Sequence, residues 1–307
     1  MRVALLAGGT GGTKLAHGFD IVAGPGDLSV VANVGDDFDL HGLHVAPDID
    51  ALLYTLGGLI DAERGWGVRG DTFTAHEMLE RYGEPAWFRV GDADLATHVE
   101  RTRRLRAGAS LTDTTAAMAD ALGISSRILP ATDDRLRTRI VTDAGTLDFQ
   151  DYFVRLRQEP EVRGVLLDGI DAARPTAAVL DAIGSADLVV LGPSNPIVSI
   201  GPILALPGMR EALEAATAPK VAVSPIVAGR ALKGPADRML ASLGHESSAL
   251  GVARMYAGLV DRFVLDEADA ALASGVEALG MAADVLPTVM RSDDDPAALA
   301  TALMALG

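Results

Sequence analysis

Short apolar runs alternate with helical patterns along most of this chain, and glycine-rich joints separate them. Such runs of Val, Leu, Ile and Ala are typical of strands buried on both faces of a parallel sheet, with the helical stretches as crossovers. The sequence therefore predicts an α/β fold, a three-layer core with a mostly parallel sheet. The expected core strands are Arg2–Ala7, Leu28–Val34, Val165–Leu167, Leu188–Leu191, Val221–Ser224 and Phe263–Leu265.

Between residues 61 and 161 this pattern gives way to a more polar segment. We expect residues 1–60 and 162–307 to form the core, and residues 61–161 to form a mainly helical insert that caps the sheet. The run Arg101–Arg106 is expected to be the solvated face of a helix rather than a binding strip. The expected elements of the insert are helices near Ala75–Tyr82, Asp94–Arg106 and Thr112–Leu122, and hairpin-like pieces around Arg139–Phe149.

The composition limits the chemistry. The 307 residues contain no cysteine, which excludes thiolate nucleophiles and leaves oxygen or His to hold any metal. A formal net charge of −16 disfavours nucleic acid and anionic lipids as partners. No run approaches the roughly 18 apolar residues of a membrane span, and Val3–Ala7 is shorter than the ~7–15-residue core of a signal peptide. We expect a cytoplasmic protein with neither a nucleic-acid nor a membrane partner.

A glycine-rich turn follows the first expected strand and precedes a helical stretch. Glycines let the backbone approach a phosphate, and a helix N-terminus attracts an anion. A lysine in the first helical turn opposes the helix dipole unless an anion is bound there. A tight turn without a ligand is the alternative. The candidate nucleotide- or diphosphate-binding residues of this turn are Gly9, Thr10, Gly11, Gly12, Thr13 and Lys14.

Known glycine fingerprints do not describe this turn. Lys14 stands where the third glycine of a dinucleotide-binding motif belongs, which weakens a nicotinamide oxidoreductase as an interpretation. The Gly-Lys-Ser/Thr ending of a P-loop is also absent. Neither a Gly-x-Ser-x-Gly elbow nor a His-Glu-x-x-His motif occurs, so serine-hydrolase and zinc-protease mechanisms lack motif support.

Four carboxylates gather after the second expected strand, at Asp36, Asp37, Asp48 and Asp50. Such a group repels itself unless a cation lies among its members. Oxygen ligands suit Mg²⁺, which takes one or two carboxylates and keeps water and substrate phosphate in its other positions. The alternative is that these aspartates cap a turn and a helix. For the group as a whole, we favour a magnesium site.

Two further strands end in polar loops. Gly192, Ser194 and Asn195 follow one of them, and Ser224 follows the next. In open α/β sheets, ligands bind beyond the carboxyl ends of the strands. Together with the glycine turn, these loops predict a polar rim that suits a nucleotide with its diphosphate, although either loop alone could be a plain turn.

Aromatic residues, which make up only 4% of the chain, are locally enriched in the insert. Trp66–Phe73 and Trp87–Asp92 hold both tryptophans and two of the seven phenylalanines. They could form a flat pocket for a ring system, and plain packing of a small subdomain explains them equally well.

Taken together and in order, the motifs of this chain resemble the 2-phospho-L-lactate transferase family. Matches begin at the first strand and continue to at least Phe263–Asp266, so the likeness covers nearly the whole chain. The segments that carry it are Gly8–Lys14, Asn33–Asp37, Pro47–Asp50 with Leu53–Gly58, Gly91–His98, Gly192–Pro196 with Ser199–Ile203, and Lys233–Asp237.

The resemblance implies a Rossmann-like core and a transferase of coenzyme F420 synthesis. The donor would be 2-phospholactate or phosphoenolpyruvate linked to guanosine diphosphate. The acceptor would be the ribityl hydroxyl of 7,8-didemethyl-8-hydroxy-5-deazariboflavin (Fo), with GMP as the leaving group. The enzyme would depend on Mg²⁺ and form a homodimer. The opening turn differs from the Gly-Gly-Thr-Gly-Thr-Pro-Lys of some family members.

Site roles follow from the same resemblance. It makes Asp50 and Arg89 deazaflavin contacts, and we add Trp66 and Asp92 of the insert to that pocket. Asp50, Asp36 and Lys14 are the expected catalytic residues: Asp50 orients the ribityl hydroxyl and accepts its proton, and Lys14 holds diphosphate oxygens.

A related family of nucleotide-sugar-binding regulatory proteins, the gluconeogenesis-factor family, is the main alternative, and its members need no catalysis. Those proteins typically carry Pro-Gly-Asp-x-Arg where this chain has Pro47–Asp50.

Overall fold

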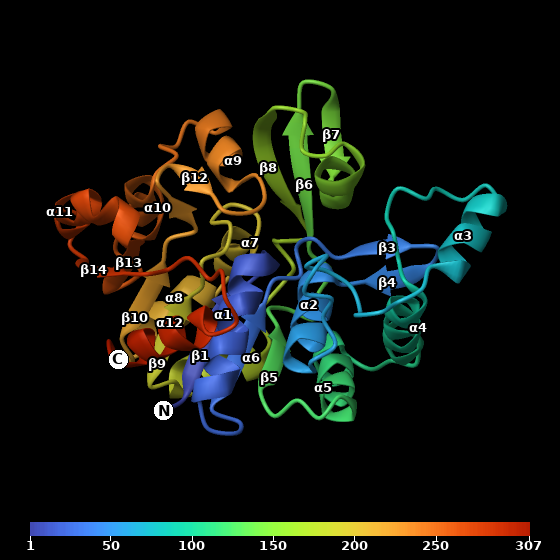
Figure 1. Cartoon of the computed structure of the whole chain (residues 1–307), viewed down its shortest axis with the longest axis horizontal. Coiled ribbons are helices and arrows are strands. Elements are labelled where there is room, and N and C mark those ends of the chain that lie inside the picture. The colour runs from blue at the N-terminus through green and yellow to red at the C-terminus, as the bar shows by residue number, and fades with distance from the viewer.

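A seven-stranded parallel sheet forms the centre of the computed structural model, which describes residues 1–307 (Figure 1). The strand order is β14-β13-β10-β9-β1-β2-β5. Helices flank the sheet on both faces, so the predicted α/β class is confirmed. The strands span Val3–Ala7 (β1), Leu28–Ala32 (β2), Arg127–Pro130 (β5), Leu188–Leu191 (β9), Lys220–Val223 (β10), Arg262–Asp266 (β13) and Ala282–Leu286 (β14).

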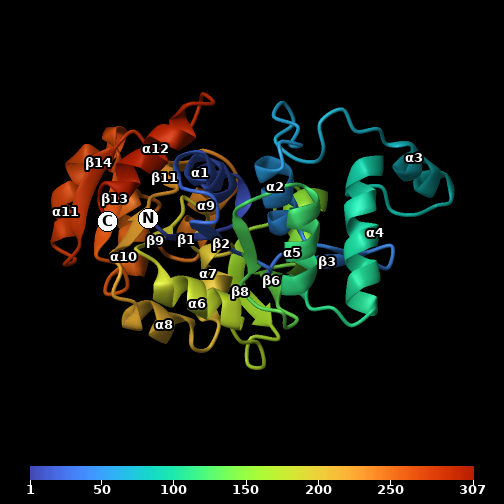
Figure 2. The same ribbon diagram turned by 90° about the horizontal axis from the view of Figure 1, so that it is seen from below.

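Helices α1 (Gly9–Val22) and α12 (Asp295–Met304) pack together on one face of this sheet, and α6 (Ala177–Ser185) and α8 (Met209–Ala215) cover the other (Figure 2). Leu15 and Phe19 of α1 are fully buried. Burial of such side chains removes apolar surface from water and is the main force that holds the layers together. The remaining core helices are α2 (Pro47–Leu56), α7 (Ile200–Ala205), α9 (Ala236–Ser242), α10 (Ala249–Tyr256), α11 (Ala273–Glu277) and the 3₁₀-helical η2 (Glu267–Leu272).

One core strand expected from the sequence belongs to another sheet, and two strands of the core sheet were not predicted. Val165–Leu167 was expected in the core sheet, and this expectation is wrong, because β8 (Val162–Asp168) pairs antiparallel with β6 in a separate sheet. Only Val162 of β8 is buried, and the other residues of the strand are half-buried or exposed, as expected for a strand with a solvated face. β5 and β14 were not predicted as core strands. β5 begins with the exposed Arg127 and ends at Pro130, so it lacks the continuous apolar run of a central strand.

The segment 61–161 contains the three predicted helices, α3 (Thr74–Arg81), α4 (Asp92–Arg106) and α5 (Leu111–Ala121), and also supplies β5 to the core sheet. A hairpin, β3 (Phe38–Leu40) and β4 (Leu43–Val45), leaves the core and packs along α4. The short hairpin β11 (Ile226–Val227) and β12 (Arg230–Ala231) follows β10.

A second, three-stranded sheet docks on the loop that follows β2. It consists of β6 (Arg137–Thr142), β7 (Gly145–Asp148) and β8, with a π-helical turn η1 (Asp151–Arg155) beside it. The backbone N–H of Thr138 donates to the carbonyl of Gly35 at 2.5 Å. Ile140 and Tyr152 share a small apolar cluster with Val198, which follows β9. The sheet therefore fixes the loops after β2 and β9 relative to one another.

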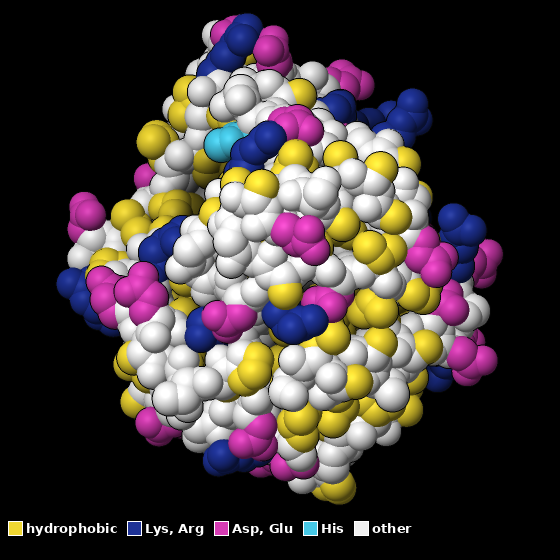
Figure 3. All heavy atoms as spheres, turned by 90° about the vertical axis from the view of Figure 1, so that its left-hand side faces the viewer, with side chains coloured by type: hydrophobic (Ala, Val, Ile, Leu, Met, Phe, Trp, Pro, Cys, Tyr) yellow, Lys and Arg dark blue, Asp and Glu magenta, His cyan; other side chains and the backbone are white.

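The surface around the C-terminal strands carries both signs of charge. Figure 3 shows acidic and basic side chains interspersed on this face, with apolar atoms between them. Val285 of the edge strand β14 is among the exposed apolar residues. No helix is long and apolar enough to cross a membrane.

Candidate active site

The loops after β1 and β9 meet at the point where the strand order reverses. From β1 the chain proceeds to β2 on one side, whereas β9 leads to β10 on the other. Such a switch point opens a crevice at the carboxyl ends of the strands. Here the backbone N–H of Gly8 donates to Ser194 Oγ at 3.3 Å. The structure thus brings together two of the loops that were predicted to form one rim.

Glycine is required for this close approach. A Cβ on Gly11 would lie 2.2 Å from the carbonyl oxygen of Pro193, and one on Gly12 would lie 2.5 Å from Ser194 Oγ. The first turn of α1 therefore presents backbone N–H groups beside the Gly192–Pro196 loop. N–H groups at a helix N-terminus form a ready site for an anion such as a diphosphate.

A pair of buried carboxylates lies beside that turn. Asp48 accepts from the backbone N–H of Gly9 at 2.6 Å. Asn33 Nδ2 donates to one oxygen of Asp48 and to one oxygen of Asp36, at 2.9 Å in each case. Both carboxyl groups are at least nine-tenths buried, and the amide of Asn33 holds them side by side.

In the absence of a cation, the environment makes both groups harder to ionise than an exposed carboxyl. Burial, followed by the nearby charges of Asp48 and Asp37, raises the pKa of Asp36 well above its usual value. Burial likewise raises the pKa of Asp48 to about 6, against the opposing hydrogen bonds from Gly9 and Asn33. Like charges that share a buried site behave in this way.

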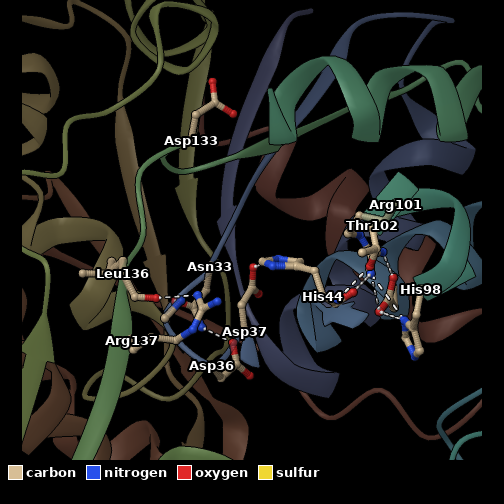
Figure 4. A network of polar contacts seen from close by, with 12 residues as sticks. Asn33, Asp36, Asp37, His44, His98, Arg101, Thr102, Asp133, Leu136 and Arg137 are labelled. Atoms are coloured by element: carbon tan, nitrogen blue, oxygen red, sulfur yellow. Dashed lines mark hydrogen bonds and ion pairs between the residues drawn. The ribbon is translucent and has the colours of Figure 1, made fainter. Parts of the chain in front are cut away.

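Asp37 turns away from this pair. Its Oδ2 lies 3.0 Å from His44 Nε2, and Figure 4 shows the side chain directed toward His44 of β4. The other oxygen, Oδ1, is buried without a hydrogen-bond partner. The backbone of His44 is held in turn by Thr102 of α4, whose Oγ1 accepts from the His44 N–H at 2.8 Å.

Asp50 belongs to a different cluster. Arg101 of α4, a fully buried side chain, donates to both of its carboxylate oxygens. His98 lies between Asp50 and Asp94, with its Nδ1 3.6 Å from Asp50 Oδ2 and its Nε2 3.4 Å from Asp94 Oδ1. Tyr54 donates to Asp94 at 2.7 Å. The predicted group of four aspartates is therefore divided, and Asp50 does not join Asp36 and Asp48.

Asp50, Asp94 and His98 are close enough for one metal ion to reach all three. The guanidinium of Arg101 already neutralises Asp50, and a second cation within a few ångströms of it would be repelled. We therefore interpret this cluster as a buried ion-pair network that joins α2 to α4.

The Asp36–Asp48 pair does fit a divalent cation. Its donor set consists of carboxylate oxygens, and its two buried like charges are not neutralised by any ion pair within the chain. Mg²⁺ commonly uses one or two carboxylates and leaves its other positions to water and substrate phosphate. The backbone N–H groups of α1 lie next to the pair, where a phosphate would bind.

Several other residues predicted to contact the diphosphate form hydrogen bonds within the chain instead. Lys14 is exposed, and its Nζ donates to the carbonyl of Met290 at 2.7 Å rather than toward the carboxylate pair. Asn195 Oδ1 accepts from the N–H of Ile197 at 2.9 Å, and Ser224 Oγ donates to the carbonyl of Ile226. Asn195 and Ser224 thus stabilise their own loops. Thr13 Oγ1 likewise donates to the carbonyl of Gly9.

In the insert, a small aromatic and cationic group surrounds Phe73. The guanidinium carbon of Arg89 lies 4.1 Å from its ring centroid, and Trp66 packs against it edge to face. Trp66 remains 42% exposed, so its ring is accessible. Asp92 accepts hydrogen bonds from Thr72 and from the backbone at the start of α3, where it orders the chain.

Sequence reasoning missed the role of Arg101. The run Arg101–Arg106 was expected to be a solvated helix face, and this is wrong for Arg101 and Thr102, which are both buried. A detectable signal was the spacing of Asp94, His98 and Arg101, which puts them on one face of α4. Asn33 was noted only as part of the segment Asn33–Asp37 and was given no role, and Arg137 was not noted. Only the fold brings Arg137 to the loop after β2 (Figure 4).

Comparison with known proteins identifies the family of the chain. Residues 3–283 match the family model described as 2-phospho-L-lactate transferase CofD. The chain is 44% identical over 306 residues to a phosphoenolpyruvate transferase of Streptomyces griseus, covering 98% of this chain and 96% of that protein. It is 40% identical to a phosphoenolpyruvate transferase of Mycolicibacterium smegmatis, covering 98% and 97%. A Bacillus halodurans protein of the UPF0052 family has a similar fold, with a TM-score of 0.66, 18% identity and 99% of both chains covered.

Proposed function

The chain belongs to the 2-phospho-L-lactate transferase family, and on that premise we propose that it is an Mg²⁺-dependent transferase of coenzyme F420 biosynthesis. In this proposal, the enzyme moves an enolpyruvyl phosphate group from a guanosine-diphosphate-linked donor to the ribityl hydroxyl of Fo. The names of the relatives support phosphoenolpyruvate over 2-phospholactate as the source of the group. The single observation that carries the proposal is the buried Asp36–Asp48 pair against the first turn of α1.

In this proposal, separate groups of residues bind the diphosphate, the metal ion and the deazaflavin. The N–H groups of Thr10 and Gly11 and the loop Gly192–Ser194 bind the diphosphate, and Asp36 and Asp48 would hold Mg²⁺. The ion would neutralise phosphate charge in the transition state, which eases both attack and departure. The insert around Trp66 and Arg89 positions the deazaflavin ring. Transfer then depends mainly on position and charge, as is typical of phosphoryl transfer.

The bond changes are simple. The ribityl oxygen attacks the phosphorus remote from guanosine and forms a new P–O bond, while the P–O bond to GMP breaks. The hydroxyl proton must leave. Asp36 is the better candidate to accept it, because only one of its oxygens accepts a hydrogen bond, from Asn33. Both oxygens of Asp50 are engaged by Arg101. We therefore propose Asp50 as a residue that fixes α2 rather than as the base.

One reconstitution experiment tests the proposal. The protein is incubated with Fo, Mg²⁺ and either the phosphoenolpyruvate-linked or the phospholactate-linked GDP donor, and products are identified by mass spectrometry. We expect a phosphodiester of Fo together with free GMP, loss of both when EDTA is added, and recovery with Mg²⁺. Absence of the phosphodiester with either donor, combined with thermal stabilisation by UDP-sugars alone, would favour a regulatory binding protein.

A further inference from the structure

The proposed donor carries more negative charge than the site has cations to meet it. A diphosphate and a carboxylate must bind beside Asp36 and Asp48, two buried carboxyl groups next to the switch-point loops. One divalent cation neutralises only part of this charge. A guanidinium is well suited to bind a carboxylate, because its planar set of donors matches the two carboxylate oxygens.

Most cations around the crevice are already engaged. Arg101 is paired with Asp50, and Lys14 donates to Met290. Arg89 lies over the ring of Phe73. None of these groups is directed toward the buried carboxylate pair with its donors free.

Arg137 is different. It is the first residue of β6, and Figure 4 shows its side chain pointing toward the loop that carries Asn33, Asp36 and Asp37. Its charge acts on the carboxylate of Asp37. Its Nη1 donates to the carbonyl of Leu136 at 3.0 Å, and it forms no ion pair with a carboxylate. Burial raises the pKa of Asp37 above its usual value, and the hydrogen bond and charge of His44, followed by the charge of Arg137, oppose this rise.

The fold holds Arg137 in this position. The N–H of Thr138 donates to the carbonyl of Gly35 at 2.5 Å, and a Cβ on Gly35 would lie 2.6 Å from Thr138 Oγ1. The side chain of Gln150 donates to the carbonyl of Asp36 at 3.3 Å. Two hydrogen bonds and the close approach of Gly35 to Thr138 thus attach β6 and the segment after β7 to the loop after β2. A half-buried guanidinium with unused donors is therefore fixed beside that loop.

We propose that Arg137 is a donor-binding residue that holds the carboxylate of the transferred group and selects for donors that carry one. The inference rests on the proposed function and assigns a specificity role within that site. A diphosphate oxygen is the other anionic group that a guanidinium could bind here, and the experiment separates the two.

The test compares two donors and three variants. The donors are phosphoenolpyruvate-linked GDP and the same molecule with its carboxylate converted to a neutral amide. The variants are Arg137→Gln, Arg137→Lys and, as a matched control, Arg135→Gln, which alters an exposed arginine two residues away. The ratio of kcat/KM for the two donors is measured together with the affinity for GDP by calorimetry.

We expect the wild type and Arg135→Gln to prefer the carboxylate donor by about 10- to 150-fold, the range for a hydrogen bond to a charged group. Arg137→Gln should reduce this preference to about threefold or less and leave GDP affinity unchanged. Arg137→Lys should be intermediate, because an ammonium supplies charge without the planar donor pair.

Two outcomes would overturn the inference. An unchanged donor preference in Arg137→Gln rules out carboxylate selection, and weaker GDP binding with that preference retained assigns Arg137 to the diphosphate. In both cases the proposed function stands, because the wild type still forms product. If the wild type forms no product from either donor, the proposed function fails, and the role of Arg137 fails with it.

Discussion

The carboxylate of Asp48, at the start of α2, accepts a hydrogen bond of 2.6 Å from the backbone N–H of Gly9, at the start of α1. This bond joins the glycine turn to the carboxylate pair. A phosphate on the N–H groups of α1 and a cation on Asp36 and Asp48 would therefore be neighbours, which is the arrangement that phosphoryl transfer needs.

Asp48→Asn should lower turnover by about 10²-fold or more, because it removes one charged ligand of the proposed Mg²⁺ site. Product formation is measured at saturating Fo over a range of Mg²⁺ concentrations, and the Mg²⁺ requirement of the variant should rise. Asp39→Asn is the control, because it makes the same chemical change at a nearby aspartate that is exposed on β3. Equal activity of the two variants would exclude Asp48 from the metal site.

The pH dependence of unfolding should reflect the same carboxyl group. The folded-state pKa of Asp48, about 6, exceeds its unfolded value of 3.8. Protonated Asp48 therefore contributes to the free energy of unfolding below pH 3.8, and this contribution is lost as the pH rises through 6. The total loss is about 3 kcal/mol. Urea unfolding in EDTA between pH 4.5 and 7.5 measures it.

The comparison with Asp48→Asn reports the contribution of the coupled pair, because the substitution removes the titration of Asp48 and also the charge that raises the pKa of Asp36. The wild type should lose more stability than the variant across that pH range. Added Mg²⁺ should restore wild-type stability at pH 7.5 and have less effect at pH 4.5, where protons compete for the ligands. A wild-type profile parallel to that of the variant would contradict the raised pKa of Asp48.

Arg101→Met should destabilise the fold by about 3–5 kcal/mol, because it leaves Asp50 buried without its partner. The free energy of unfolding in urea measures this loss. Arg103→Ala, two residues along α4, removes an exposed ion pair with Glu100 and should leave the urea midpoint unchanged. Similar midpoints for both variants would show that the Asp50–Arg101 pair is not structural.

Asp50→Asn separates the catalytic assignment made from sequence from the structural one. If Asp50 is the catalytic base, the variant should lose ~10²–10⁴-fold in turnover with little change in the free energy of unfolding. If Asp50 fixes α2 instead, the variant should unfold at lower urea, and a turnover change below about threefold in the folded fraction is expected. Urea unfolding gives the folded fraction of the variant, and turnover divided by that fraction distinguishes the two roles.

Gly11→Ala should destabilise the protein by about 1–3 kcal/mol and weaken GDP binding, because the new Cβ would collide with the carbonyl of Pro193. Gly184→Ala is the matched control, since it also lies in a helix but has no atom within 4 Å of the added Cβ. That control should be neutral or slightly stabilising. Calorimetry with GDP and urea unfolding measure both effects, and unchanged GDP affinity in Gly11→Ala would place the nucleotide elsewhere.

Local sequence was sufficient to predict the class of the fold and the position of its polar loops. Continuous apolar runs such as Leu188–Leu191 are readable as buried parallel strands because both of their faces meet helices. The glycine turn and the aspartates after β2 follow strand ends, so their convergence at one edge was predictable. Strands with one solvated face, such as β8, carry a weaker signal, and β8 was therefore assigned to the wrong sheet.

Only the tertiary structure determined which charged and polar side chains form pairs. Asp48 and Asp50 are two residues apart, yet the turn of α2 directs one toward Gly9 and the other toward Arg101. Arg137 reaches the loop after β2 only because a separate sheet docks there. Long-range pairing of polar side chains depends on the directions in which packed elements hold them, and the spacing of residues along a single chain does not contain that information.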